Sequence, residues 1–227
     1  MRTQIAALLA ILIAVSASPL SVFGQGTRQV LVLGNPQFID DQAIAQATGA
    51  AVSRNTGAVQ LADVAVLVLA NIAVASLPEH VRSGLVQYVS SGGALLITGG
   101  NRSFGSGNYQ GVSSVLPFAI RANDDWRAIP FRSPVPIQPG HPILAGVEFT
   151  TIGSVNDMNP LPGATEILQA AGGGGGGSYP YPLIAERSIG GRVIGMAFDP
   201  DSLIGAMPTL PRLVQNTLQY LLESSRR

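Results

Sequence analysis

The hydrophobic pattern of the chain predicts several short buried strands. Three apolar runs, at residues 28–34, 63–70 and 94–98, are rich in Val, Leu and Ile, and the first and third are closed by glycine. Continuous apolar runs of this length are typical of parallel sheets, in which helices cover both faces. We therefore expect these three segments to form a buried parallel sheet, with a short helix at residues 40–48.

An amphipathic helix is predicted at Leu77–Ser91, between the second and third apolar runs. Ser76 is its expected N-cap, and the Gly92-Gly93 pair is expected to end it. A strand, a helix and a second strand in this order predict a β–α–β unit with a right-handed crossover. The positions expected to face the sheet are Val81, Leu85, Tyr88 and Val89.

The carboxyl-terminal part of the chain predicts an antiparallel hairpin and a closing helix. Strands are expected at residues 182–187 and 192–198 around a Gly-Gly turn, and helical periodicity follows at residues 209–223. Another strand is expected at residues 165–170, ahead of the glycine run 172–177, which favours a surface hairpin loop. These elements predict one α/β domain with a mostly parallel sheet and an antiparallel hairpin at one edge.

The first residues have the pattern of a secretory signal. A basic start precedes an apolar run at residues 5–15, and Val22 and Gly24 fit the −3 and −1 positions of a cleavage site. That run is shorter than the ~20 residues that a membrane-spanning helix needs. We predict a signal peptide at residues 1–24, a single domain at residues 25–227, and export to the periplasm or the extracellular space. The alternative is an uncleaved N-terminal segment that anchors the chain in a membrane.

The composition excludes several kinds of chemistry. The 13 basic residues are all Arg and balance 13 acidic residues, and charged residues make up only 11% of the chain, so no nucleic-acid partner is expected. Without Lys there is no Schiff-base or P-loop chemistry, and without Cys there is no disulfide, thiolate nucleophile or Cys-based metal site. The two histidines, His80 and His141, are too few for a His-rich metal site. We predict neither a cofactor nor a metal.

Spaced glycines and aromatic residues mark the segment from Asp63 through Phe118. A helix ends in Y-V-x-x-G-G, and after the next strand come G-G-x-x-S-F-G-x-G-x-Y and a Leu-Pro pair. In this pattern the segment resembles the glutamine amidotransferase-like family, and residues 140–147 and 182–200 are similar to later elements of that family. The matching positions of the first segment are Tyr88, Val89, Gly92, Gly93, Gly99, Gly100, Ser103, Phe104, Gly105, Gly107, Tyr109, Leu116 and Pro117.

The resemblance implies the class I glutamine amidotransferase-like fold, a flavodoxin-like three-layer sandwich. Active members of that class use a Cys nucleophile with a His-x-Glu pair, but this chain has no Cys, and His141 is followed by Pro142 and Ile143. Glutamine hydrolysis by that route is therefore excluded. The strand-to-loop turn is expected to remain at the end of the strand 94–98, where backbone N–H groups can meet an anion or a carbonyl oxygen. The expected ligand-binding residues are Gly99, Gly100, Asn101, Arg102, Ser103 and Tyr109.

A hydrolase is an alternative interpretation of the same segment. In it Ser103 replaces the missing thiol and His141 acts as its base, with Asp124, Asp125 or Asp199 orienting the imidazole. The spacing disfavours this interpretation, because a nucleophile elbow has the form G-x-S-x-G and this chain has one residue more between Gly100 and Ser103. The other interpretation is that the Ser103 hydroxyl holds the glycine-rich turn.

Charged residues near the expected strand ends leave two further questions open. Arg102 either binds a carboxylate or phosphate or forms a surface ion pair. Asp199 and Asp201 form either a carboxylate pair for a metal or, as the pattern favours, an N-cap within a turn.

The function that these observations favour is that of an exported, non-catalytic amidotransferase-like domain. Its partner is expected to be a small molecule or an envelope protein, bound at the loop 99–109. Two alternatives remain open, namely the hydrolase that uses Ser103 with His141 and a structural module of an envelope assembly. Neither composition nor resemblance identifies the ligand.

Overall fold

The computed structural model describes residues 28–55, 57, 59–171 and 180–225. The predicted signal peptide and the glycine run lie outside these residues. The helices are α1 (Asp41–Thr48), α2 (Glu79–Ser90) and α3 (Leu210–Ser224), and short 3-10 helices lie at η1 (Leu61–Asp63), η2 (Val74–Ser76), η3 (Tyr109–Val115), η4 (Pro142–Leu144) and η5 (Pro200–Leu203). The strands are β1 (Gln29–Gly34), β2 (Ala51–Ser53), β3 (Val64–Ala70), β4 (Ala94–Thr98), β5 (Phe118–Ile120), β6 (Trp126–Arg132), β7 (Pro134–Pro136), β8 (Ile152–Asn156), β9 (Met158–Pro160), β10 (Thr165–Ala170), β11 (Tyr181–Ile189) and β12 (Gly191–Met196).

Within the described residues, eight strands form one sheet in the order β2-β1-β3-β4-β12-β11-β10-β7. The five strands from β2 to β12 are parallel to their neighbours, whereas β11, β10 and β7 continue the sheet in antiparallel fashion. This arrangement confirms the predicted α/β fold with a mostly parallel sheet. The predicted hairpin is β11–β12, and its second strand pairs directly with β4, so that β10 and β7 extend the antiparallel part beyond it.

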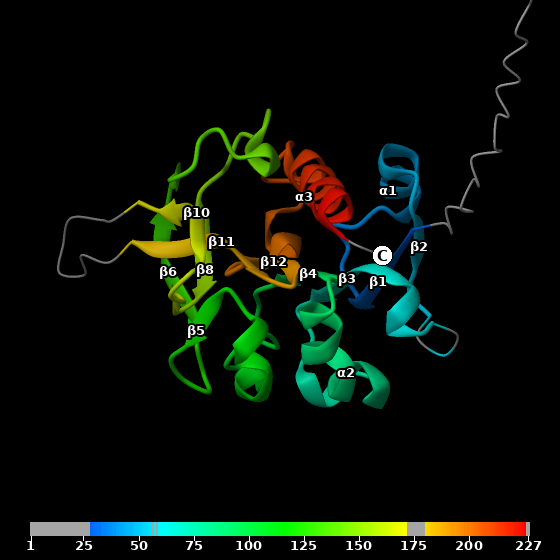
Figure 1. The fold of residues 1–227 in the computed structure, drawn as a ribbon. Helices are drawn as coiled ribbons and strands as arrows, with labels where there is room; N and C mark the ends of the chain where they lie inside the picture. Colours follow the sequence, from blue (N-terminus) through cyan, green and yellow to red (C-terminus); the bar gives the residue numbers. More distant parts are fainter. Residues whose placement is uncertain (1–27, 56, 58, 172–179, 226–227) are drawn as a thin grey trace, which may run out of the picture.

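Helices cover both faces of the sheet, as Figure 1 shows: α1 and α3 lie over one face and α2 over the other. In β3, Val66 and Val68 pack in the cluster that contains α1 and α3, whereas Leu67 and Leu69 pack in the cluster that contains α2. Every residue of β3 is buried. The continuous apolar run thus reflects a strand that is covered on both sides, which is the three-layer sandwich that the resemblance implied.

Local sequence signals located both ends of α1 but not the start of α2. Asp40 caps α1 by accepting a hydrogen bond from Ala43 N, and Gly49 ends this helix at a φ of 69°. The prediction for α2 was wrong at its start, because Ser76 ends η2 and the helix begins at Glu79 after Pro78. Proline at position 78 disfavours helical backbone at Leu77, so the helix cannot continue back to Ser76.

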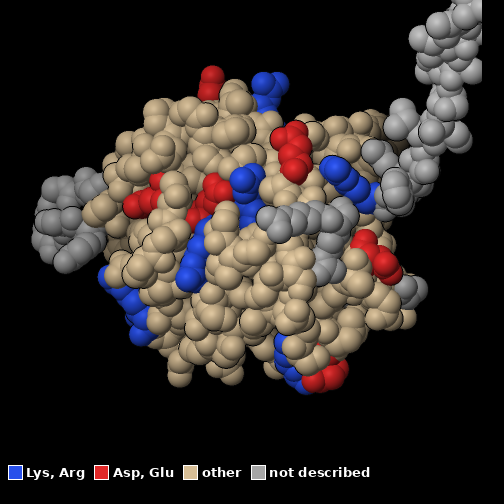
Figure 2. All heavy atoms as spheres, in the orientation of Figure 1, with Lys and Arg blue, Asp and Glu red and all other residues tan. Residues whose placement is uncertain are grey.

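Charged side chains are sparse on the surface and several of them form ion pairs, such as Arg54 with Asp41. On the face shown in Figure 2, acidic and basic side chains are interspersed on a mostly uncharged surface. In the part of the chain that the structure describes, no helix is long and apolar enough to cross a bilayer.

Candidate functional site

A pocket lies at the carboxyl ends of the parallel strands. The chain passes from β1 through α1 to β2 on one side of β1, while β3 lies on its other side, so the strand order reverses between β1 and β3. Open α/β sheets bind ligands at such a reversal. The pocket there has a volume of about 170 Å³, and we call it the switch-point pocket; it is lined by Asn35, Pro36, Phe38, Ala70, Asn71, Arg102, Asp199 and Asp201.

Asn71 joins three segments around the switch-point pocket. It follows β3 directly and has a φ of 40°, in the left-handed region that Asn tolerates better than most residues. Its Oδ1 atom accepts a hydrogen bond from Arg102 N at 2.9 Å, and its Nδ2 atom donates to Asp199 Oδ2 at 2.9 Å. This side chain therefore holds the ends of β3, β4 and β12 in register at the pocket.

Two carboxylates, those of Asp199 and Asp201, also line the pocket. Asp201 Oδ1 accepts hydrogen bonds from Gln37 N and Phe38 N, both at 2.8 Å, and so fixes the segment that follows β1. Asp199 caps η5 by accepting from Asp201 N at 3.1 Å. The geometry of Asp199 and Asp201 thus supports the N-cap interpretation. The described residues contain no group of three or more His, Cys, Asp or Glu side chains that could hold a metal ion.

Burial raises the pKa of the Asp199 carboxyl above its ordinary value. The hydrogen bond from Asp201 N opposes this rise, the negative charge of Asp201 adds to it, and the hydrogen bond from Asn71 opposes it. The folded state therefore holds the Asp199 proton more tightly than the unfolded state does. Stability from this group is present at low pH and is lost as the pH rises through the raised pKa.

We expect Asp199→Asn to become more stable relative to the wild type as the pH rises from about 3 to about 7, across the range in which an aspartate ionises. The variant keeps an acceptor oxygen for Asp201 N but carries no charge that burial would penalise. Urea unfolding at several pH values measures the difference. Asp124→Asn, at an exposed neighbour of the loop, is the matched control for replacing one carboxylate by an amide. A stability difference for Asp199→Asn that stays constant or shrinks over this range would contradict the expectation.

The glycine-rich loop after β4 is held by side chains from distant segments. Gly100 N donates to Asn156 Oδ1 at 2.9 Å, and Asn156 Nδ2 donates to Asp125 Oδ1 at 2.9 Å. Asp125 also accepts from the backbone N–H groups of Gly105 and Ser106, each at 3.0 Å. Asp125 is 1% exposed, so its carboxylate is a buried acceptor for the loop. Asp125 therefore holds the backbone of the loop. It does not orient the imidazole of His141, as the hydrolase interpretation would require.

The structure does not bring Ser103 and His141 together. Ser103 is fully buried, and its hydroxyl donates to the carbonyl of Thr98 at 2.5 Å. His141 Nε2 instead lies 3.1 Å from Glu186 Oε2, and its ring packs edge-on against Tyr220 of α3. The serine–histidine pair that the hydrolase interpretation requires is therefore not formed, because each side chain is held by another partner.

The remaining residues of the predicted binding loop have different roles. Gly99 and Tyr109 are buried, and Tyr109 donates its hydroxyl hydrogen to Ile72 O at 2.8 Å. Burial raises the pKa of this phenol, so it stays neutral at physiological pH. Asn101 and Arg102 are exposed, and of the predicted loop residues Arg102 lines the switch-point pocket. The buried members support the turn that presents Arg102.

The sequence analysis missed Asn35 and Asn71. Each is a polar residue close behind the last apolar position of a predicted parallel strand, Asn35 after β1 and Asn71 after β3. Carboxyl ends of parallel strands meet at one edge of the sheet, so these positions carried a usable signal. The hydrophobic pattern does not give the order of the strands in the sheet. That order brings Asn35 and Asn71 to the same pocket.

Comparison with known proteins gives the fold without a family assignment. No protein-family model matches this chain, and no curated protein matches it. Solved structures do match. A cytoplasmic protein from Salmonella typhimurium has a TM-score of 0.68 at 16% sequence identity, with 88% of this chain and 100% of that chain covered.

Two other solved structures extend the comparison. A ThuA-like protein from Bacteroides uniformis has a TM-score of 0.56 at 12% identity, covering 88% of this chain and 93% of that one. A chain of PurLQS from Thermotoga maritima has a TM-score of 0.51 at 12% identity, and the match covers 86% of this chain and 100% of that one. This chain shares with these structures a flavodoxin-like α/β fold with a mostly parallel sheet. At these identities the likeness concerns the fold alone.

Proposed function

We propose that the protein is an exported, non-catalytic amidotransferase-like domain that binds a small polar ligand in the switch-point pocket. The observation that carries the proposal is the position of this pocket at the reversal of strand order, with two amide residues, an arginine and two aspartates among the residues that line it. Its volume of about 170 Å³ is below the range of drug-sized pockets, which favours a ligand of few atoms.

The partners of the lining residues indicate which groups such a ligand carries. Arg102 Nη2 has a long contact of 3.4 Å to Ser76 Oγ, so most of its donors can serve a ligand. Asp201 uses its Oδ1 atom for two backbone N–H groups, which leaves Oδ2 as an acceptor. A molecule with a carboxylate or hydroxyl oxygen for Arg102 and with donors for the aspartates fits this arrangement.

The absence of catalysis is part of the proposal and rests on the residues of the loop. The sequence has no Cys, and the Ser103 hydroxyl is buried and bound to a backbone carbonyl. Export is also part of the proposal, and it is supported by the signal-like pattern of residues 1–24.

The test is a thermal-shift screen of the purified full chain against amino acids, monosaccharides and nucleotides. A ligand at 100 times its Kd stabilises the folded state by about 2.7 kcal/mol, which raises Tm by roughly 5–10 °C in a domain of this size. We expect Arg102→Ala to lose the shift and Arg127→Ala, an exposed arginine of β6, to keep it. If no compound gives a shift, or if Arg102→Ala keeps it in full, small-ligand binding at this pocket is wrong. A pull-down from envelope extract then tests for a protein partner.

A further inference from the structure

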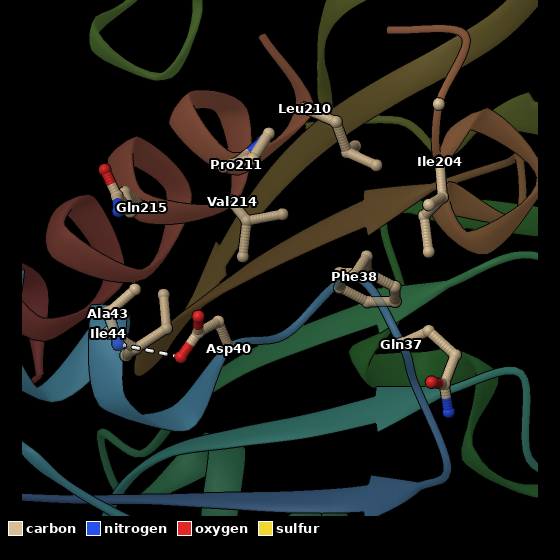
Figure 3. A pocket seen from close by; sticks show the side chains of 11 residues that line it. Gln37, Phe38, Asp40, Ala43, Ile44, Ile204, Leu210, Pro211, Val214 and Gln215 are labelled. Carbon is tan, nitrogen blue, oxygen red and sulfur yellow. Dashed lines mark hydrogen bonds between the residues drawn. The ribbon is translucent and has the colours of Figure 1, made fainter. Parts of the chain in front are cut away.

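A second pocket lies between α1 and α3, on the face of the sheet that these helices cover (Figure 3). We call it the interhelix pocket. Its volume is about 250 Å³. The residues that line it come from the segment after β1, from α1, from the turn after η5 and from the start of α3; they are Gln37, Phe38, Asp40, Ala43, Ile44, Ile204, Gly205, Leu210, Pro211, Val214 and Gln215.

The floor of the interhelix pocket is apolar. Ile44, Leu210 and Val214 are at most 3% exposed and belong to the core, whereas Ile204 at the opening is 50% exposed. Figure 3 shows the side chains of Phe38, Ile204, Leu210 and Val214 around the same space. Apolar pockets of a few hundred Å³ hold small hydrophobic molecules, and a cavity of about 150 Å³ lined by Leu, Ile and Phe is large enough for benzene. This pocket therefore fits one aromatic ring with a short substituent.

Asp40 supplies the one charge among the lining residues. One of its carboxylate oxygens accepts the capping hydrogen bond from Ala43 N at 2.9 Å, and in Figure 3 the other points toward α3. A neighbouring cation does not neutralise it, because Arg54 is bound to both oxygens of Asp41 and to Ile39 O. The pocket thus combines an apolar floor with a carboxylate at its rim that has no ion pair among the described residues.

We propose that the interhelix pocket binds a small amphiphilic amine, with its apolar body on the core side chains and its ammonium group at Asp40. This site is separate from the switch-point pocket, and its occupancy does not depend on the function proposed above. The apolar floor supplies the affinity, since burial of hydrocarbon is favourable in proportion to the area covered. The carboxylate selects the charge of the ligand, since an ammonium–carboxylate hydrogen bond is charge-assisted.

Three probes of one shape test the proposal by NMR titration of the full chain. They are 2-phenylethylamine, the neutral 2-phenylethanol and the anionic phenylacetate. We expect all shifts to centre on the methyl groups of Ile44, Leu210 and Val214, and the amine to bind about two- to fivefold more tightly than the alcohol, the range for a partly exposed ion pair. Phenylacetate should bind most weakly. No binding of the amine, or equal affinity for amine and alcohol, overturns the proposal.

Substitutions at Asp40 and at Ala43 test separately whether binding depends on the charge of the carboxylate and on the space in the pocket. Asp40→Asn keeps an N-cap of similar strength, so we expect α1 to stay folded and the preference for the amine over the alcohol to disappear. Ala43→Phe fills the pocket and should abolish binding of both, whereas the same substitution at Ala47, an exposed position of the same helix, should leave binding intact. An amine preference that persists in Asp40→Asn would also overturn the proposal. Arg102→Ala should not change amine affinity, so the two proposed sites can fail independently.

Discussion

Replacing Asp125 by Ala is expected to destabilise the protein by about 3–5 kcal/mol, because it leaves more than one buried donor unsatisfied and each such donor costs about 1–3 kcal/mol. The carboxylate is 1% exposed and accepts from Gly105 N, Ser106 N, Ser106 Oγ and Asn156 Nδ2. The donors on Gly105 and Asn156 are buried, and Ser106 is half-buried. Removing the acceptor leaves them unsatisfied, and the cost of that desolvation is not recovered.

Urea unfolding measures this effect, and the neighbouring residue offers a matched control. Asp124 is exposed, so Asp124→Ala should change the free energy of unfolding by no more than about 0.5 kcal/mol. Asp125→Asn should fall between the two, because one acceptor oxygen remains while the new amide group faces donors. A loss below about 1 kcal/mol for Asp125→Ala, as is typical of a water-exposed hydrogen bond, would show that the loop is not held by this carboxylate.

The roles of Asp125 and Asn71 also show where sequence reasoning ends. Hydrophobic runs located β3 and β4 because burial on both faces leaves a continuous apolar stretch, a signal contained within a few residues. The hydrogen bond between Asp125 and Asn156 joins residues that lie 31 positions apart, and the one between Asn71 and Asp199 spans 128 positions. No local pattern encodes such pairs, so the function of each side chain is defined only when the sheet order is known.

The strand pairing between η3 and β10 could not be predicted from the sequence for a related reason. Between η3 and β10 the structure has short two-stranded pairs, β5 with β9 and β6 with β8, and neither pair joins two strands that are consecutive in the chain. Pro130 lies within β6, where a sequence pattern would disfavour a strand. The candidate site was therefore only partly predictable: the glycine turn and Arg102 follow from the motif, while Asn35 and Asn71 depend on tertiary contacts.

Replacing Gly100 by Ala is expected to cost about 2–4 kcal/mol and to disrupt the switch-point pocket. Gly100 has a φ of 132°, a conformation that residues with a Cβ atom rarely adopt, and an added Cβ would collide with the side-chain amide of Asn71. Asn71 would have to move, which breaks its hydrogen bonds to Arg102 N and Asp199. Gly111→Ala is the control, because no heavy atom lies within 4 Å of its added Cβ, and we expect it to be neutral or stabilising.

The two sources of this cost can be separated with a second variant. Asn71→Gly removes the amide that the new Cβ strikes and suits the φ of 40° at that position. If the collision with Asn71 contributes, Gly100→Ala should cost about 1–2 kcal/mol less in the Asn71→Gly background than in the wild type, the size of coupling expected for residues in contact. Equal costs in the two backgrounds would mean that backbone strain at Gly100 acts alone.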